Sequence, residues 1–201
     1  METLFLARHA LAGSNRDGLA SCTTPGPELT REGVAQARAL GASLAGEEIA
    51  LGVASELRRT QETLEIALEG LAVPRLVVPE LDEIRYGSFD GGLLDDYRVW
   101  ARSEPPTVRA PGGGESRADA AARYARGLGL VLERSEPVAL LVGHALAVRY
   151  ILDAARGLVP APLITPVEHA RAYELSASEA RAAAELLDEW SRSPAFRAPP
   201  V

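Results

Sequence analysis

The sequence predicts an α/β protein with three layers, a mainly parallel sheet lying between two layers of helices. Two patterns indicate this α/β/α sandwich: short apolar runs typical of buried strands, and segments of helical apolar periodicity that separate them. Strands that alternate with helices are joined by crossovers, which produce a parallel sheet covered on both faces. The length of 201 residues suits one sizeable core, so we expect a single soluble domain over residues 1–201.

The elements follow one another in a regular order. Strands are expected at residues 3–7, 49–54, 75–78, 138–142 and 170–175, and helices at residues 30–46, 57–68, 115–132, 145–156 and 178–190. Thr30 is the expected N-cap of the first helix, since a hydroxyl there accepts a hydrogen bond from the first turn. Ligands of such folds collect at the carboxyl ends of the strands.

Segments rich in glycine and proline mark the loops. Residues 13–27 and 103–114 are expected to be surface loops near the site. Residues 90–102 are expected to form a short helix with Trp100 on its apolar side, within a loop or lid insertion over about residues 88–116. The tail over residues 193–201 holds three prolines without periodicity and is expected to be flexible.

The net charge of the chain indicates which classes of binding partner to expect. The chain has 28 acidic and 21 basic residues, a formal net charge of -7 and no dense basic run, so we expect no nucleic-acid partner. No apolar stretch approaches the roughly 20 residues that cross a bilayer. The N-terminus carries charge too early for a signal peptide, so we expect a cytoplasmic protein without a membrane partner.

The lack of lysine and the presence of one cysteine exclude several catalytic mechanisms and binding sites. The chain has no lysine, which rules out mechanisms that depend on a Schiff-base lysine or a P-loop lysine. Cys22 is the single cysteine, so neither an internal disulfide nor a cysteine-based zinc site can form.

Two expected strands end in a histidine. Arg8 and His9 follow the first strand, and Gly143 and His144 follow the fourth. A single histidine after an apolar strand is more often a hydrogen-bonded core residue than a functional one. Two of them at the carboxyl ends of strands in one sheet favour a functional site there.

Arginines and carboxylates follow two further strands. Arg58 and Arg59 lie in the first turn of a helix, whose N-terminus attracts anions, and they point about 100° apart, so only one is expected to face the site. The segment 80–91 carries several carboxylates, one of which could donate a proton. Surface arginines and a solvated acidic loop are the alternative interpretations.

Together these residue types suit phosphoryl transfer. Arginines bind phosphate oxygens through two parallel hydrogen bonds and neutralise their charge. A neutral imidazole can attack phosphorus when its other ring nitrogen is held by a hydrogen bond, and a carboxylic acid can protonate the leaving alkoxide.

An ordered set of motifs resembles the histidine phosphatase superfamily, also called phosphoglycerate mutase-like. The motifs are Arg8-His9, LTREGVAQA at 29–37, SELRRTQET at 55–63, LDEIRYGSFDG at 81–91, GGES at 113–116 and Gly143-His144. The resemblance covers residues 3 to 175 and implies the phosphoglycerate mutase-like fold, with no metal and no cofactor.

The resemblance also implies roles for single residues. His9 would be the nucleophile that becomes phosphohistidine, and Glu83 the proton donor, with Asp82 the weaker candidate. The residues that would bind phosphate are Arg8, Asn15, Arg59 and His144.

The sequence departs from the family pattern near the nucleophile. Ala10 stands where glycine is usual, and Ala12 stands where a hydroxyl residue commonly contacts phosphate. Ser14 could substitute for that hydroxyl. Neither change removes a proton carrier or a main cationic group, so we expect the protein to be active.

Three functions compete. We expect a metal-independent phosphatase that hydrolyses a small-molecule phosphomonoester. A phosphoglycerate-type mutase is disfavoured, because Ile84 and Ala145 stand where mutases carry arginine and glycine. A weakly active, regulatory phospho-ligand-binding protein would have no need of Glu83.

A zinc hydrolase that uses all three histidines, His9, His144 and His169, is a further alternative, although we expect His169 to be a structural or rim residue.

The substrate is expected to be a phosphorylated small molecule, and a homodimer is left open. Weaker candidates for substrate contacts are Arg16, Arg85, Tyr86 and Arg102, with Phe89 and Trp100 able to pack against a ring.

Overall fold

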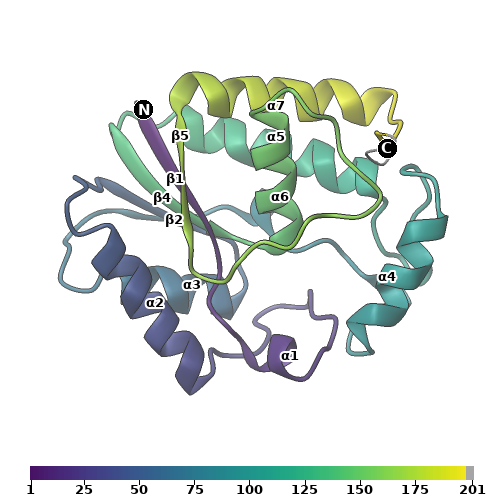
Figure 1. Cartoon of the computed structure of the whole chain (residues 1–201), viewed down its shortest axis with the longest axis horizontal. Coiled ribbons are helices and arrows are strands. Elements are labelled where there is room, and N and C mark those ends of the chain that lie inside the picture. The colour runs from purple at the N-terminus through teal and green to yellow at the C-terminus, as the bar shows by residue number, and fades with distance from the viewer. Residues whose placement is uncertain (198–201) are drawn as a thin grey trace.

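The computed structural model describes residues 1–197, which form one five-stranded sheet between two layers of helices (Figure 1). The sheet order is β3-β2-β4-β1-β5, with β1 at Thr3–Arg8, β2 at Leu51–Ala54, β3 at Arg75–Val77, β4 at Val138–Gly143 and β5 at Ala172–Ser176. Four strands are parallel, so the predicted fold class is confirmed.

The helices divide between the two faces of the sheet. Helices α2 (Arg31–Ser43) and α3 (Arg58–Ala67) pack together on one face. On the other face α7 packs on α5 and α6, as Figure 1 shows; these helices span Arg117–Leu132 (α5), Ala145–Ala154 (α6) and Ala177–Arg192 (α7). Strand residues alternate between the two cores: Leu4 and Leu6 pack on the α5–α7 side, and Phe5 and Ala7 on the α2–α3 side.

Local chemistry explains where the helices begin. The Thr30 hydroxyl accepts a hydrogen bond from the Gly33 amide at 3.0 Å, so this predicted N-cap is present. Ser116 and Ser176 form capping boxes at the starts of α5 and α7. Gly33 also lets α2 approach the chain just after β1, because a Cβ at this position would lie 2.1 Å from the Leu11 carbonyl oxygen.

Strand β5 runs antiparallel to β1, unlike the others. Helix α6 leads away from the carboxyl end of β4, and the long connection after it returns to that end, where His169 bridges Arg8 (Figure 1). A strand that starts there must run in the opposite direction.

Three short elements surround the carboxyl ends of the strands. Residues 13–27, expected to be loop, contain the one-turn helix α1 (Gly13–Arg16). Two 3₁₀ turns, η1 (Pro79–Leu81) and η2 (Gly87–Phe89), follow β3. The expected helix at 90–102 is α4 (Leu94–Ser103), in which Tyr97 and Ala101 are buried and Trp100 packs partly buried beside them.

The described part of the tail contacts the rest of the chain. The Trp190 indole donates to the Ala195 carbonyl at 2.8 Å, Phe196 lies against Trp190, and Arg197 pairs with Asp153 at 2.7 Å. The rest of the expected tail, residues 198–201, lies outside the described residues. Within residues 1–197, no helix combines the length and apolar character that a membrane span requires.

Candidate active site

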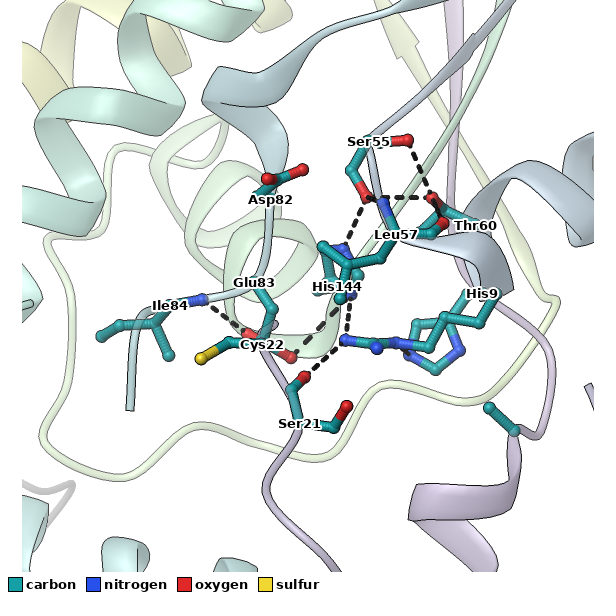
Figure 2. Close-up of polar contacts among 12 residues, drawn as sticks. His9, Ser21, Cys22, Ser55, Leu57, Thr60, Asp82, Glu83, Ile84 and His144 are labelled. Carbon is teal, nitrogen blue, oxygen red and sulfur yellow. Dashed lines mark hydrogen bonds and ion pairs between the residues drawn. The ribbon is translucent and has the colours of Figure 1, made fainter. Parts of the chain in front are cut away.

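The two histidines that follow β1 and β4 lie side by side. Arg8 pairs with Gly143 in the parallel register, and the His9 amide donates to the Gly143 carbonyl at 2.9 Å. The ring centroids of His9 and His144 are 5.4 Å apart, and both residues are buried (Figure 2). The sheet therefore brings together the two histidines that the sequence singled out.

Hydrogen bonds fix the tautomer of His9. Its Nδ1 lies 2.8 Å from the Ala10 carbonyl oxygen, which can only accept, so Nδ1 carries the proton. Its Nε2 accepts from Nε of Arg59 at 3.2 Å and therefore carries the lone pair. Burial, and then the nearby Arg59 charge, hold the pKa of His9 well below its usual value, which keeps the ring neutral.

Arg59 lies between the histidines and is buried. Its Nη2 donates to the Ser21 carbonyl at 3.0 Å and to Nδ1 of His144 at 3.2 Å, while its buried Nη1 has no hydrogen-bond partner among residues 1–197. Arg58 is exposed and pairs with Glu28 and Glu62. Only one of the two adjacent arginines thus faces the site, as the helical geometry predicts.

A chain of hydroxyl groups fixes the tautomer of His144. Because Arg59 donates to Nδ1, the proton lies on Nε2, which is 2.8 Å from the Ser55 hydroxyl. Ser55 lies 2.9 Å from the Thr60 hydroxyl, which in turn donates to the Leu57 carbonyl at 2.7 Å (Figure 2). Burial and then Arg59 hold the pKa of His144 well below its usual value. Sequence reasoning missed this relay, although Ser55 directly follows β2.

Glu83 reaches the site from the segment after η1. Its Oε2 lies 3.9 Å from Nδ1 of His144, and its Oε1 accepts from the Ile84 amide at 3.1 Å. The Arg123 side chain donates to the carbonyls of Asp82 and Glu83 at 2.8 and 3.2 Å, which holds this segment in place.

The carboxylate of Asp82 makes a different contact from that of Glu83. Its Oδ1 accepts from the Glu56 amide at 2.8 Å, and Figure 2 draws no contact between its carboxylate and His144. Burial raises the pKa of Asp82 to about 6. The geometry therefore brings Glu83, and not Asp82, to the histidines.

A cavity of about 270 Å³ opens above this cluster. In the part of the chain that the structure describes, its charged lining consists of Arg8, Arg59, Arg98 and Arg117 and one carboxylate, Glu83. The cavity is therefore cationic in a protein whose formal net charge is -7, and such a pocket attracts anions.

Helix α1 forms one wall of the cavity through Ser14 and Asn15. The Asn15 amide oxygen accepts from the Ala12 amide at 3.2 Å, which orients the side chain. Ala10 and Ala12 are buried, and the Ala10 amide donates to the Thr63 hydroxyl at 3.0 Å. The extra methyl group of Ala10 is thus accommodated in the turn that holds His9.

Three of the weaker candidates are not among the residues that line the cavity. Arg16 pairs with its neighbour Asp17, Arg85 pairs with Glu115, and Arg102 is exposed on α4. Tyr86 does line the cavity and is buried against Tyr97, with ring centroids 4.7 Å apart.

The lining also includes residues that sequence reasoning did not single out. Leu94, Tyr97 and Arg98 come from α4, and Arg117 from the start of α5, whereas no residue of the loop at 103–114 lines the cavity. Residues between 162 and 167 close another side. Their sequence has no periodicity that would have marked them.

The three histidines do not converge as metal ligands. Both nitrogens of His144 are engaged by Ser55 and Arg59, and Nε2 of His9 faces the Arg59 guanidinium. Nδ1 of His169 lies 2.7 Å from the His9 carbonyl oxygen. Because a carbonyl oxygen can only accept, His169 donates this hydrogen bond. Among residues 1–197, no group of three or more His, Cys, Asp or Glu side chains is arranged to hold a metal ion.

The carboxyl edge of this α/β sheet brings together two neutral histidines and the arginines Arg8 and Arg59. This combination is typical of proteins that bind phosphate groups. The family model of the histidine phosphatase superfamily (branch 1) matches residues 4–193, and the chain belongs to this family.

The names of similar proteins describe more than one enzymatic activity. The adenosylcobalamin/alpha-ribazole phosphatase of Escherichia coli is 38% identical over 87 residues, 43% of this chain and 42% of that protein. The 2,3-bisphosphoglycerate-dependent phosphoglycerate mutase of Beijerinckia indica is 32% identical over 177 residues, 78% of this chain and 82% of that protein. The first of these alignments spans less than half of its relative.

Solved structures agree over more of the chain. A mycobacterial glucosyl-3-phosphoglycerate phosphatase, solved with VO3, is 27% identical with a TM-score of 0.73, and the match covers 88% of this chain and 91% of that one.

Proposed function

We propose that the protein is a phosphatase that hydrolyses a small-molecule phosphomonoester through a phosphohistidine formed at His9. The observation that carries the proposal is the state of the His9 ring: Nδ1 is held by the Ala10 carbonyl, so Nε2 is the nucleophilic nitrogen. The phosphatase names of relatives support the same activity.

In the first step the substrate phosphate enters the cationic end of the cavity. The unpaired nitrogens of Arg59 and Arg8 are available to its oxygens. Arg59 then turns its hydrogen bonds from His9 to the phosphate, which frees Nε2. The Nε2 lone pair forms a bond to phosphorus as the bond from phosphorus to the ester oxygen breaks.

Glu83 provides the proton in this step. In its acid form the carboxyl group donates its proton to the departing ester oxygen, which leaves as an alcohol. An unprotonated alkoxide would be a poor leaving group, so the position of Glu83 beside His144 at 3.9 Å suits this role.

The second step returns the site to its starting state. The Glu83 carboxylate takes a proton from a water molecule, whose oxygen attacks the phosphorus of phosphohistidine. The bond from phosphorus to Nε2 breaks, inorganic phosphate leaves, and His9 is neutral again. No step of this sequence draws on a metal ion or a cofactor.

A phosphoglycerate-type mutase is the second candidate, because the relative that matches 78% of the chain carries that name. A mutase must retain the phosphoryl group for a second acceptor. Ile84 and Ala145, which line the cavity, stand where mutases of the family carry arginine and glycine, and this disfavours the mutase.

The test is hydrolysis of p-nitrophenyl phosphate with EDTA present, in the protein and in His9→Ala. We expect turnover that resists EDTA and is lost in the variant. Turnover abolished by EDTA would contradict the proposal in favour of a metal enzyme. Absence of turnover on any phosphate ester would favour a binding protein, and isomerisation of phosphoglycerate without phosphate release would favour the mutase.

A further inference from the structure

Three arginine nitrogens in the described part of the chain are buried without a hydrogen-bond partner: Arg8 Nε, Arg59 Nη1 and Arg117 Nε. All three arginines line the same cavity. Buried donors without partners are costly, and where they gather in one cavity they indicate that a ligand supplies the acceptors. Arg8 and Arg59 are accounted for by the phosphate, whereas Arg117 is not.

The polar neighbour of Arg117 is the buried hydroxyl of Tyr150, which is neutral and leaves the guanidinium charge uncompensated. The guanidinium lies over the Tyr97 ring, 5.7 Å from the centroid, and among residues 1–197 it forms no ion pair. Arg98, the other extra arginine of the lining, already pairs with Asp95 at 2.8 Å. The acidic residue in the first turn of α5, Asp119, pairs with Arg109 instead.

Arg117 is also the first residue of α5, where the helix dipole disfavours a cation. An anion bound in front of this residue would interact favourably with both the guanidinium and the helix N-terminus. Its position and its free nitrogen thus point to the same kind of ligand.

The wall of the cavity between its charged groups is apolar. It is formed by Leu94 of α4, Leu146 of α6 and Ile164 of the connection before β5, together with Ile84, Leu163 and Val167. A substrate body that fills this space must bury apolar surface, and a polyhydroxylated body would lose hydrogen bonds to water there.

We propose that Arg117 determines specificity by binding a carboxylate at the far end of the substrate, across an apolar body from the phosphate. The inference rests on the proposed function for the phosphate end and adds the chemical class of the remainder. Arg117 is a binding residue that touches the substrate and takes no part in the transfer of the phosphoryl group.

The experiment compares ω-carboxyalkyl phosphates of increasing chain length with the matching ω-amides, which are similar in size and neutral. We expect kcat/KM to pass through an optimum of chain length for the acids that the amides do not share. In Arg117→Met, kcat/KM for the best acid should fall about 10- to 100-fold, the effect of losing a charge-assisted hydrogen bond. The amides should change by less than about threefold.

Two further variants separate binding from folding. Arg126→Met removes an exposed arginine of the same helix that does not line this cavity, and it should leave both series unchanged. Arg117→Lys keeps the charge without the planar fork and should recover part of the preference. An equal loss on acids and amides in Arg117→Met, or no preference for acids at any length in the unaltered protein, would overturn the inference.

Direct binding keeps this inference distinct from the proposed function. Calorimetric titration of the best acid and its amide into the unaltered protein and into Arg117→Met measures how much more tightly the acid binds than the amide. This measurement does not depend on hydrolysis of the ester. If no ester is hydrolysed, the proposed phosphatase activity fails, and the acid preference and its loss in the variant still decide the role of Arg117. If esters are hydrolysed and acids bind no better than amides, the phosphatase stands and the inference fails.

Discussion

Nε of Arg59 lies 3.2 Å from Nε2 of His9, so the guanidinium expected to hold the phosphate covers the nitrogen expected to attack it. The same guanidinium donates to His144 and to the Ser21 carbonyl, and within residues 1–197 its Nη1 has no acceptor. Substrate binding must therefore rearrange Arg59 before the nucleophile is free.

Replacing Arg59 with lysine should reduce kcat/KM severely. A lysine ammonium is a compact point charge and cannot contact the two histidines, Ser21 and a phosphate oxygen as the planar fork does. We expect a loss of about 100-fold or more for p-nitrophenyl phosphate, the size seen when an electrostatic stabiliser is removed. The exposed neighbour provides the control: Arg58→Lys should retain nearly full activity. Comparable losses in the two variants would remove Arg59 from this role.

The Glu83→Gln variant should discriminate between leaving groups. For alkyl phosphates, whose alkoxides need a proton, the rate should fall about 100-fold or more. For p-nitrophenyl phosphate, whose leaving group is stable as an anion, the loss should be much smaller. Asp82→Asn, on the other side of the same segment, is the matched control and should show no such dependence. Steady-state rates on both esters measure this, and equal losses in Glu83→Gln would contradict the role of proton donor.

Anion binding should draw a proton onto His144. In the free protein its Nδ1 is an acceptor, so it can donate to a phosphate oxygen only after protonation, which a nearby anion favours. Sulfate carries no proton of its own near neutral pH, and calorimetry in buffers of different ionisation enthalpy should therefore detect proton uptake at pH 7. Ser55→Ala should weaken the uptake, since the hydrogen bond from Nε2 is stronger in the charged ring. Proton release, or no exchange, would be inconsistent with this account of His144.

Protein stability should fall as the pH decreases below about 6.5, the usual pKa of histidine. The pKa values of His9 and His144 are held well below that value by burial, and burial lowers the pKa of His169 to about 4. The unfolded chain therefore takes up protons before the folded one, so the free energy of unfolding decreases with falling pH. Each fully buried histidine contributes up to about 1.4 kcal/mol per pH unit, and the partly exposed His169 less.

Asp82 acts in the opposite direction. Its pKa is raised to about 6, so the folded protein takes up this proton first and gains stability as the pH falls through that value. Denaturant unfolding between pH 6.5 and pH 5 measures the balance. His169→Gln should make the slope shallower and Asp82→Asn should make it steeper; a flat or inverted profile in the unaltered protein would argue against neutral, buried histidines.

The sequence was sufficient for the sheet and for the central cluster, because both depend on local patterns. Apolar runs located every strand end to within two residues. The parallel register then brings His9, Ser55 and His144 to one edge. The choice of Arg59 over Arg58 required the family resemblance, since helical geometry states only that one of them faces the site.

The rest of the cavity depends on long-range packing. Arg98 lines the cavity and Arg102, one turn further along α4, does not, and nothing in their local sequence distinguishes them. Likewise the connection at 162–167 reaches the site because α6 and β5 both run away from the carboxyl edge of the sheet. The chain between them must therefore return to that edge, which no periodicity predicts.

The phosphorylated intermediate offers the most direct test of the account. Rapid-quench mixing with an ester that carries radioactive phosphorus should capture an acid-labile label in the peptide that contains His9, formed and lost fast enough to account for turnover. His9→Ala should show neither label nor turnover. Release of product at the normal rate, with no label on His9 at any time point, would contradict the claim that this imidazole attacks phosphorus.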